Sequence, residues 1–459
     1  MTTSTARDHE RPLLMVGAVL AAVGLGRAVQ FGNGAFTPEA ITWLFGVCAT
    51  LIIAWLLPPN VHLTPRLGSA VAVVGAMALV YQFSILSSYP PGVYLQVRVA
   101  DPWRTFQEGV GMAAVIAGLG FAKDKWVRGL ALVGLVGVYL MLGNWLIFTS
   151  PQPTIDVWHI HRESVTELLK GINPYTLTFK NIYQDGRYFG PGMVENGRLM
   201  FGYTYPPLSL LLAIPGQLWG DYRFSLLVCN SVTALLMAFA RPSRFGAMAA
   251  ALFLFTPRSF FVLEQGWTEP VLLLCVALVG FMAIRFPKAL PIVAGLMLAS
   301  KQYAVLLGPA LLLLPEATRD RKTFIAFAWK TVAVAALFTV PFFLWGPKAF
   351  LHSVFEVQFG LPFRTDSLNV SAWWVQRGNE QPPGILGWLM LIPAYALLWW
   401  RAPRTAGGFA LGAGTVLMFF VVLNRQAFCN YYFMIIGSLL VGAAFSFPAD
   451  DSAGATREA

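Results

Sequence analysis

The sequence is poor in charge and in cysteine. Of its 459 residues, 12% are charged, whereas 57% are hydrophobic and 14% are aromatic. A soluble domain usually carries about 25% charged residues, so this composition excludes an ordinary water-soluble enzyme. The four cysteines, Cys48, Cys229, Cys275 and Cys429, are scattered along the chain. Their spacing excludes a disulfide framework and a cysteine-based metal site.

Several catalytic signatures are also missing. The sequence has no Walker A pattern, no GxGxxG after a strand, no HExxH and no nucleophile elbow. It lacks the DxD triplet with which soluble sugar-nucleotide transferases commonly hold a metal, which argues against a cytoplasmic nucleotide-sugar site. The net charge of +10 does not indicate nucleic-acid binding, because Lys and Arg form short clusters between apolar runs.

Apolar runs of spanning length are abundant and predict an all-α polytopic membrane protein. We expect spans at 13–29, 39–57, 67–88, 107–121, 129–148, 222–240, 245–257, 268–286, 289–300, 302–315, 323–344, 384–400, 405–423 and 429–447. The segment Leu208–Gly220 is short and contains Pro215, so we expect it to lie in the outer interface without crossing. Five basic clusters then share one side, which predicts about fourteen helices with both chain ends in the cytoplasm.

The longest polar interval runs from Pro153 to Pro207 on the opposite, outer side. Near its start, apolar residues at helical spacing predict an amphipathic helix on the outer leaflet. Asp156, Glu163 and Glu167 share another face of that helix, and Gly171 suits its C-terminal cap. Asp156 has two compatible interpretations, a helix N-cap or a general base at the membrane surface. Glu163 and Glu167 are better explained as the solvated face of the helix.

Two cations stand at the expected outer boundary. Lys301 joins two apolar segments that are each too short to span, and such a lysine is costly in lipid. Arg425 occupies a similar place before the last span. Together they suit a phosphate at head-group level, although a snorkelling turn lysine is the alternative for Lys301. Glu264 and Glu269 lie in a polar turn between spans, where they are either solvated or functional.

Several short motifs carry a resemblance to a known family. They are LLKGINPY at 168–175, YPPL at 205–208, GDYR at 220–223, SKQY at 300–303 and NRQAFCNYY at 424–432. Their order resembles the GT-C superfamily of glycosyltransferases that use polyprenyl-phosphate sugars, in particular the bacterial α-mannosyltransferase-like branch, glycosyltransferase family 87. The resemblance covers roughly residues 145–447. It implies a GT-C-like helical bundle in the plasma (inner) membrane, with its active site on the extracytoplasmic face.

The resemblance also implies roles for individual residues. Asp156 corresponds to the catalytic base, and Lys301 to the basic residue that contacts the donor phosphate. Arg425 is expected to bind the same phosphate because of its similar position in the sequence. We expect further substrate contacts from Glu163, Tyr205, Glu264, Gln302 and Tyr431. The partners would be a polyprenyl-phosphate sugar, with mannose the expected sugar, a lipid or glycan acceptor and membrane lipids. No cofactor and no obligatory metal are expected, because a lipid phosphate is already a good leaving group.

The position of the acidic loop departs from the family pattern. GT-C proteins usually place it after their first span, whereas here four further spans come first. We therefore expect an N-terminal extension at 1–127, a catalytic module at 128–447 with an outer loop at 149–221, and a cytoplasmic tail at 448–459. An arabinofuranosyltransferase, a flippase for lipid-linked sugars and a membrane sensor without catalysis are the alternative functions.

Overall fold

The computed structural model describes residues 11–59, 61, 64–96, 102–122, 124–183 and 188–447, so the expected tail at 448–459 lies outside the described residues. Within them, seven helices are long and apolar enough to cross a membrane, and five further apolar helices have 10–17 residues. The protein is an all-α polytopic membrane protein. The shorter helices account for most of the difference between these seven and the fourteen spans expected from hydropathy.

The N-terminal part of the chain is a series of long helices. They are α1 (Pro12–Gln30), the 3-10 turn η1 (Phe31–Gly34), α2 (Pro38–Leu56), α3 (Pro65–Ser88), α4 (Pro102–Leu119) and α5 (Lys125–Thr149). Polar caps define several of these boundaries: Thr37 accepts a hydrogen bond from the Ala40 N–H at the start of α2, and Asp124 accepts two at the start of α5. Such side chains satisfy backbone donors that have no partner within the helix.

The polar interval forms a small subdomain after α5. It contains α6 (Asp156–Leu169), η2 (Pro174–Thr176), β1 (Phe179–Lys180), β2 (Val194–Glu195), β3 (Arg198–Leu199) and α7 (Pro207–Leu218). The strands form an antiparallel sheet in the order β1-β3-β2, in which Phe179 and Val194 both lie opposite Leu199. Asn196 and Gly197 have φ of 49° and 75°, as a tight hairpin turn requires.

The remaining helices complete the bundle. They are α8 (Arg223–Ala240), α9 (Arg244–Leu254), α10 (Ser259–Glu264), α11 (Glu269–Arg285), η3 (Pro287–Ala289), α12 (Leu290–Leu298), η4 (Gln302–Leu313), α13 (Pro315–Thr318), α14 (Arg321–Trp345), α15 (Pro347–Leu351), the π-turn η5 (His352–Glu356), α16 (Val357–Gly360), α17 (Val370–Gln376), α18 (Leu386–Leu389), α19 (Leu391–Arg401), α20 (Ala406–Val422) and α21 (Cys429–Ser446). The single span expected at 384–400 is divided into α18 and α19. Elsewhere the expected boundaries differ from the observed ones by a few residues.

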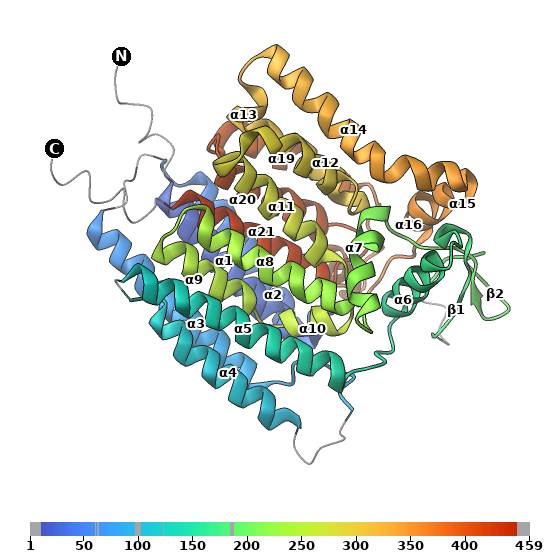
Figure 1. Ribbon diagram of the computed structural model, residues 1–459, viewed down its shortest axis with the longest axis horizontal. Helices are drawn as coiled ribbons and strands as arrows, with labels where there is room; N and C mark the ends of the chain where they lie inside the picture. Colours follow the sequence, from blue (N-terminus) through green and yellow to red (C-terminus); the bar gives the residue numbers. More distant parts are fainter. Residues whose placement is uncertain are drawn as a thin grey trace.

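The centre of the bundle is built from α1, α8, α11, α20 and α21 (Figure 1). Small residues allow these helices to approach closely, as is common between membrane helices. A Cβ added to Gly442 of α21 would lie 2.5 Å from Leu411 Cγ of α20, and one added to Gly17 of α1 would lie 2.2 Å from Ala54 Cβ of α2. In contrast, α14 lies at the edge of the bundle beside α12 and buries little of its surface (Figure 1).

Basic side chains gather at the end of the bundle opposite α6. Arg11 and Arg401 both donate to the Trp55 carbonyl at the end of α2, over 3.1 and 3.0 Å. Arg285 donates to the Ala240 carbonyl at the end of α8 over 2.8 Å. Cations at helix C-termini satisfy free carbonyls and favour the helix dipole. These contacts bring together the arginines that the sequence places on one side.

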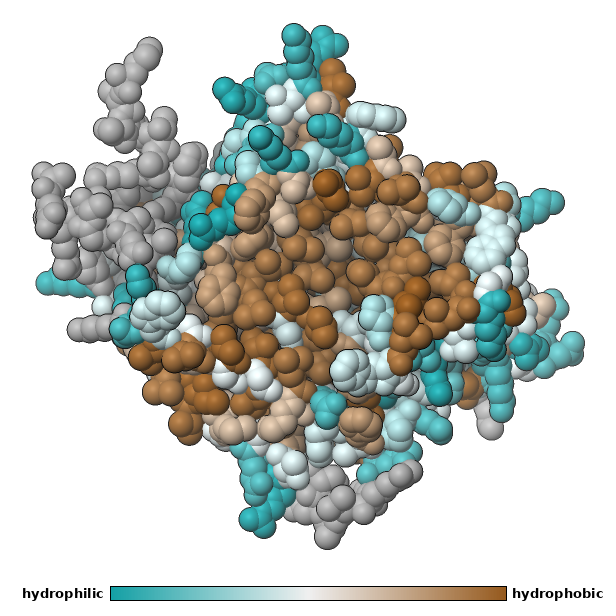
Figure 2. Space-filling view, in the orientation of Figure 1, coloured by the Kyte–Doolittle hydropathy of each residue, from teal (hydrophilic) through white to brown (hydrophobic). Residues whose placement is uncertain are grey.

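The surface fits this arrangement. Figure 2 shows hydrophobic residues spread over the middle of one face, with hydrophilic residues at its margins. The exposed apolar side chains include Ile325, Val332 and Leu337 of α14 and Leu130 and Val133 of α5. A soluble monomer rarely exposes so much contiguous apolar surface, whereas a lipid bilayer would cover it.

Candidate functional site

Asp156 is the first residue of α6, and Ile155 occupies the N-cap position. Its Oδ1 accepts the Val157 N–H over 2.8 Å and the Tyr183 hydroxyl over 3.2 Å. The interpretation of Asp156 as the N-cap is therefore wrong by one position, although its carboxylate does satisfy a backbone donor of the first turn. Burial raises the pKa of Asp156 above its usual range, while these two hydrogen bonds and the charge of Arg364 act in the opposite direction.

Behind Asp156 lies a stack that sequence reasoning missed. The Tyr183 and Tyr188 rings are parallel within 16°, with centroids 4.2 Å apart. The Arg364 guanidinium lies 4.4 Å from the Tyr188 ring centroid and 4.9 Å from that of Phe428. Asp366 holds Arg364 through bonds of 2.8 and 2.6 Å. No sequence pattern marks Arg364, because it comes from a loop nearly two hundred residues away from Tyr183.

Lys301 forms a buried ion pair at the junction of α12 and η4. Its Nζ lies 2.5 Å from Glu269 Oε1 and donates to Thr268 Oγ1 over 3.0 Å. The Lys301 side chain is 5% exposed and that of Glu269 is 0% exposed. The interpretation of Glu269 as a solvated turn residue is therefore wrong. Removing one partner of such a buried ion pair strongly destabilises the folded protein, because the other charge then stays buried without compensation.

Glu269 is the centre of a wider polar cluster. Besides Lys301, its Oε1 accepts the Tyr303 hydroxyl over 3.2 Å and the Asn430 side-chain amide over 2.7 Å. Among the described residues, Oε2 of the same carboxylate has no hydrogen-bond partner. Thus α11, η4 and α21, three elements that do not follow one another directly in the sequence, meet at one carboxylate.

Three partly exposed tyrosines surround this ion pair. Lys301 Nζ lies 4.7 Å from the Tyr205 ring centroid and 5.5 Å from that of Tyr303. The Tyr303 and Tyr431 ring centroids are 5.8 Å apart. An ammonium beside aromatic faces is stabilised by the ring quadrupoles. The structure therefore brings Lys301, Tyr205 and Tyr431, which the sequence singled out separately, into one cluster.

His161 connects α6 to this cluster through α7. Its Nδ1 lies 3.3 Å from the Tyr203 hydroxyl, which is 2.8 Å from Ser209 Oγ in α7. The His161 ring is parallel to the Tyr222 ring, with centroids 4.3 Å apart. Burial lowers the pKa of His161 to about 3, so the ring is neutral at physiological pH. The Leu208 N–H then donates to the Ala299 carbonyl over 3.2 Å, two residues before Lys301.

Tyr205 links the two charged groups electrostatically. After burial, the negative charges of Glu269 and Asp156 are the largest influences that raise the pKa of the Tyr205 phenol. The Tyr205 ring centroid lies 5.6 Å from that of Tyr203, which in turn lies 5.1 Å from that of His161 in α6. Since Lys301 lies beside Tyr205 and Asp156 is the first residue of α6, these ring contacts connect the two charged groups into one candidate site at the α6 end of the bundle.

Other residues singled out by sequence have different surroundings. Gln302 donates to the Thr204 carbonyl and, over 3.0 Å, to that of Val354, so it ties the loop before α7 to η5. Arg425 is exposed and donates to the Phe359 carbonyl over 3.1 Å. Glu163 is exposed on α6. Within the described part of the chain, none of these three side chains forms a hydrogen bond or an ion pair with Lys301 or Glu269.

Glu264 is buried, so the alternative of a solvated turn residue is wrong here as well. Its two carboxylate oxygens accept the Val93 and Tyr94 N–H groups, each over 2.8 Å. The neighbouring Arg223, buried beside Asp221 at 2.7 Å, donates to the Glu264 carbonyl over 3.2 Å and to the Ser150 carbonyl over 2.8 Å. These bonds anchor loops from three parts of the chain beneath the site.

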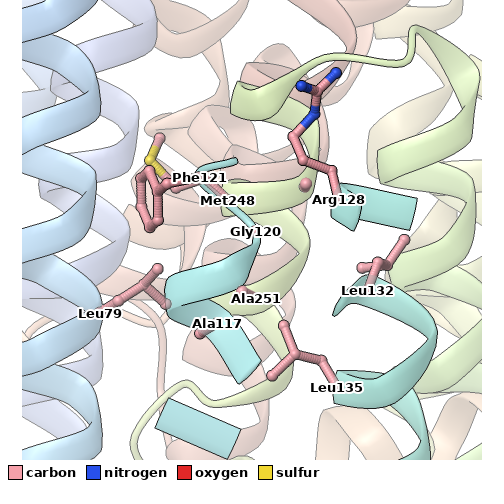
Figure 3. Close-up of a pocket in the computed structure, with 10 residues that line it drawn as sticks. Leu79, Ala117, Gly120, Phe121, Arg128, Leu132, Leu135, Met248 and Ala251 are labelled. Carbon is pink, nitrogen blue, oxygen red and sulfur yellow. The ribbon is translucent and has the colours of Figure 1, made fainter. Parts of the chain in front are cut away.

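A small apolar pocket lies elsewhere, between α3, α4, α5 and α9 (Figure 3). Leu79, Leu132 and Leu135 line it, and the Arg128 guanidinium, at its edge, donates to the Ala122 carbonyl over 3.0 Å. Arg128 is near the start of α5, and most of this 25-residue helix separates it from α6, a distance of about 30 Å. The pocket is therefore not part of the site. Among the described residues, no three His, Cys, Asp or Glu side chains are grouped to hold a metal.

Comparison with known proteins gives one structural likeness. No family model matches this chain, and no curated protein is significantly similar to it. The crystal structure of ArnT from Cupriavidus metallidurans, bound to undecaprenyl phosphate, has a TM-score of 0.39 and 18% sequence identity with this chain. The match covers 71% of this chain and 60% of ArnT, so the chain spans less than two thirds of that protein's length.

Proposed function

We propose that this protein is a GT-C-type membrane glycosyltransferase that transfers a sugar from a polyprenyl-phosphate donor to a lipid or glycan acceptor. The observation that carries the proposal is the combination of a partly buried carboxylate, Asp156, with a buried lysine, Lys301, in one site of a membrane-spanning helical bundle. Of the sequence motifs that resemble glycosyltransferase family 87, SKQY contains Lys301, and LLKGINPY begins at the end of the helix that Asp156 starts. The catalytic module is residues 128–447.

The reaction needs a base at the acceptor and a cation at the donor. The acceptor hydroxyl attacks the anomeric carbon, and a new C–O bond forms as the bond from that carbon to the phosphate oxygen breaks. The electron pair of the broken bond leaves with the polyprenyl phosphate. Asp156 takes the proton of the acceptor hydroxyl. One displacement of this kind inverts the anomeric centre.

Lys301 suits the phosphate end of this reaction. An ammonium has three N–H donors, and two of those of Lys301 bind Thr268 and Glu269. The third remains for a phosphate oxygen, next to the Tyr205 face. Charge that grows on the leaving phosphate is then stabilised by a cation already held in place, which avoids reorganisation during the reaction.

The remaining substrate contacts follow from the same geometry. The partly exposed Tyr205 and Tyr431 offer aromatic faces to the sugar, and Gln302 shapes the loop beneath them. Arg425, Glu163 and Glu264 lie outside this cluster, so we propose at most indirect roles for them. The site faces the extracytoplasmic side of the plasma membrane, because the basic clusters occupy the other end of the bundle.

Mannose is the proposed sugar, and arabinofuranose is the alternative within the same reaction class. The test uses purified full-length protein in lipid nanodiscs, radiolabelled polyprenyl-phosphate mannose or arabinofuranose, and a membrane lipid extract as the acceptor. We expect label to move from one of the donors to a new product. Asp156→Asn is the matched inactive control. Absence of transfer from both donors, combined with movement of a fluorescent polyprenyl-phosphate sugar across liposomes, would favour a flippase instead.

A further inference from the structure

Tyr183 contacts Asp156 through both its donor and its acceptor capacity. Its hydroxyl donates to Asp156 Oδ1 over 3.2 Å and accepts the Asp156 backbone N–H over 3.3 Å. The first N–H groups of a helix lack partners within the helix. Ile155, at the N-cap, provides no side-chain acceptor. Tyr183, from the loop after β1, therefore supplies the acceptor that the N-cap residue lacks.

These contacts give the two carboxylate oxygens of Asp156 different hydrogen-bonding environments. Oδ1 is occupied by the Tyr183 hydroxyl and by the Val157 N–H at 2.8 Å. Within the described part of the chain, Oδ2 takes part in no side-chain hydrogen bond, and Asp156 keeps some solvent exposure. A carboxylate held at one oxygen presents the other in a defined orientation.

We propose that Tyr183 is a positioning residue, which fixes Oδ1 of Asp156 so that Oδ2 can accept the proton of the acceptor hydroxyl. This inference rests on the proposed role of Asp156 as the base. Tyr183 itself touches neither the sugar nor the phosphate in this account. Its hydroxyl donates to the ionised carboxylate, so it also favours the form of Asp156 that can act as a base.

Stacking contacts hold the Tyr183 ring on the side away from Asp156. Its ring lies on Tyr188 at 4.2 Å, and the Arg364 guanidinium lies on the far part of the same stack, 4.4 Å from Tyr188. Asp366 fixes Arg364 in turn. Two loops, one after β1 and one after α16, thus hold the phenol against the start of α6.

The pH dependence follows from the groups around Asp156. Among the described residues, those that influence or are influenced by its charge, from every neighbouring element, are Tyr183 and Arg364 with Tyr94, Tyr205 and Tyr222. Burial raises the pKa of Asp156, whereas the Tyr183 hydroxyl lowers it. Removing that hydroxyl must raise the pKa further, so ionised Asp156 would be lost at a higher pH than in the wild type.

The test compares Tyr183→Phe with Tyr188→Phe in the full-length protein. Tyr188→Phe keeps the ring stack and removes a hydroxyl that has no hydrogen bond to Asp156, so it is the matched control. A hydrophobic carbodiimide reacts with protonated carboxyl groups, and mass spectrometry of the Asp156 peptide measures its labelling against pH. We expect the labelling midpoint to move up by about one pH unit in Tyr183→Phe, as loss of a hydrogen bond to a charged group implies. Tyr188→Phe should leave it unchanged.

In Tyr183→Phe, the acid limb of the pH profile of kcat/KM should shift to higher pH by the same amount. The substrate is radiolabelled polyprenyl-phosphate mannose or arabinofuranose. An unchanged labelling midpoint in Tyr183→Phe, or an equal shift in Tyr188→Phe, would overturn the positioning role. Because labelling needs no substrate, it also separates the two hypotheses. If the labelling midpoint of Asp156 shifts in Tyr183→Phe but the wild-type protein transfers neither sugar, the positioning role of Tyr183 is supported and the proposed reaction is rejected.

Discussion

Replacing Asp156 by Asn separates its chemical role from its structural one. The amide oxygen of Asn can still accept the Val157 N–H and the Tyr183 hydroxyl, which are the two bonds that Oδ1 accepts now. The change removes the negative charge next to the helix N-terminus, which is worth about 0.3–1 kcal/mol. The free energy of unfolding should therefore fall by no more than about 1 kcal/mol.

The effect on the reaction should be much larger. An amide cannot take the proton of the acceptor hydroxyl, and removal of a general base lowers the rate by about 10²–10⁴. That loss corresponds to about 2.7–5.4 kcal/mol of activation free energy. Glu163→Gln, on the exposed face of the same helix, is the matched control and should keep near-wild-type turnover.

The assay combines transfer of radiolabelled sugar with two measurements on the same preparations. Thermal unfolding in detergent checks the fold, and binding of unlabelled polyprenyl phosphate checks the donor site. We expect Asp156→Asn to pass both checks and to transfer almost no sugar. Turnover close to wild type in a folded Asp156→Asn protein would refute the role of Asp156 as the base. The hydrogen bonds that Asn can still accept would then account for everything that Asp156 contributes.

The remaining predictions concern the ion pair and the topology. Lys301→Gln should destabilise the protein by about 3–5 kcal/mol by leaving Glu269 buried and unpaired, and adding Glu269→Gln should recover most of this loss. Unfolding in mixed detergent micelles measures the stability of both variants. Equal stability of the single and double variants would contradict the energetic coupling of Lys301 and Glu269. Both variants should bind polyprenyl phosphate at least about tenfold more weakly than wild type; normal binding by the double variant would make Lys301 purely structural. An impermeant maleimide should label Asn379→Cys but not Ser243→Cys in intact cells after removal of the native cysteines, and outside labelling of Ser243→Cys would reverse the assigned orientation.

The sequence alone predicted most helices, because spanning length and helical periodicity are local properties. The amphipathic pattern after Asp156 forms α6, which ends at Leu169. Gly171 follows with φ of 78°, and the Gly171 and Ile172 N–H groups donate to the Leu168 and Glu167 carbonyls. Those bonds satisfy the last carbonyls of the helix in the way that a C-terminal glycine allows. The join at Lys301 was equally visible, since neither apolar flank was long enough to span.

Tertiary structure alone decided which polar groups meet. Glu264 and Glu269 have the same residue type and are five positions apart, yet one binds backbone amides of the loop before α4 and the other binds Lys301. Arg425 looked equivalent to Lys301 in the sequence but is exposed, whereas Arg364, which no motif marks, lies behind Asp156. Hydropathy determines which segments enter the membrane, because burial of apolar area scales with composition. The partner of a buried charge depends instead on distances between elements tens to hundreds of residues apart, and only the packed bundle sets those distances.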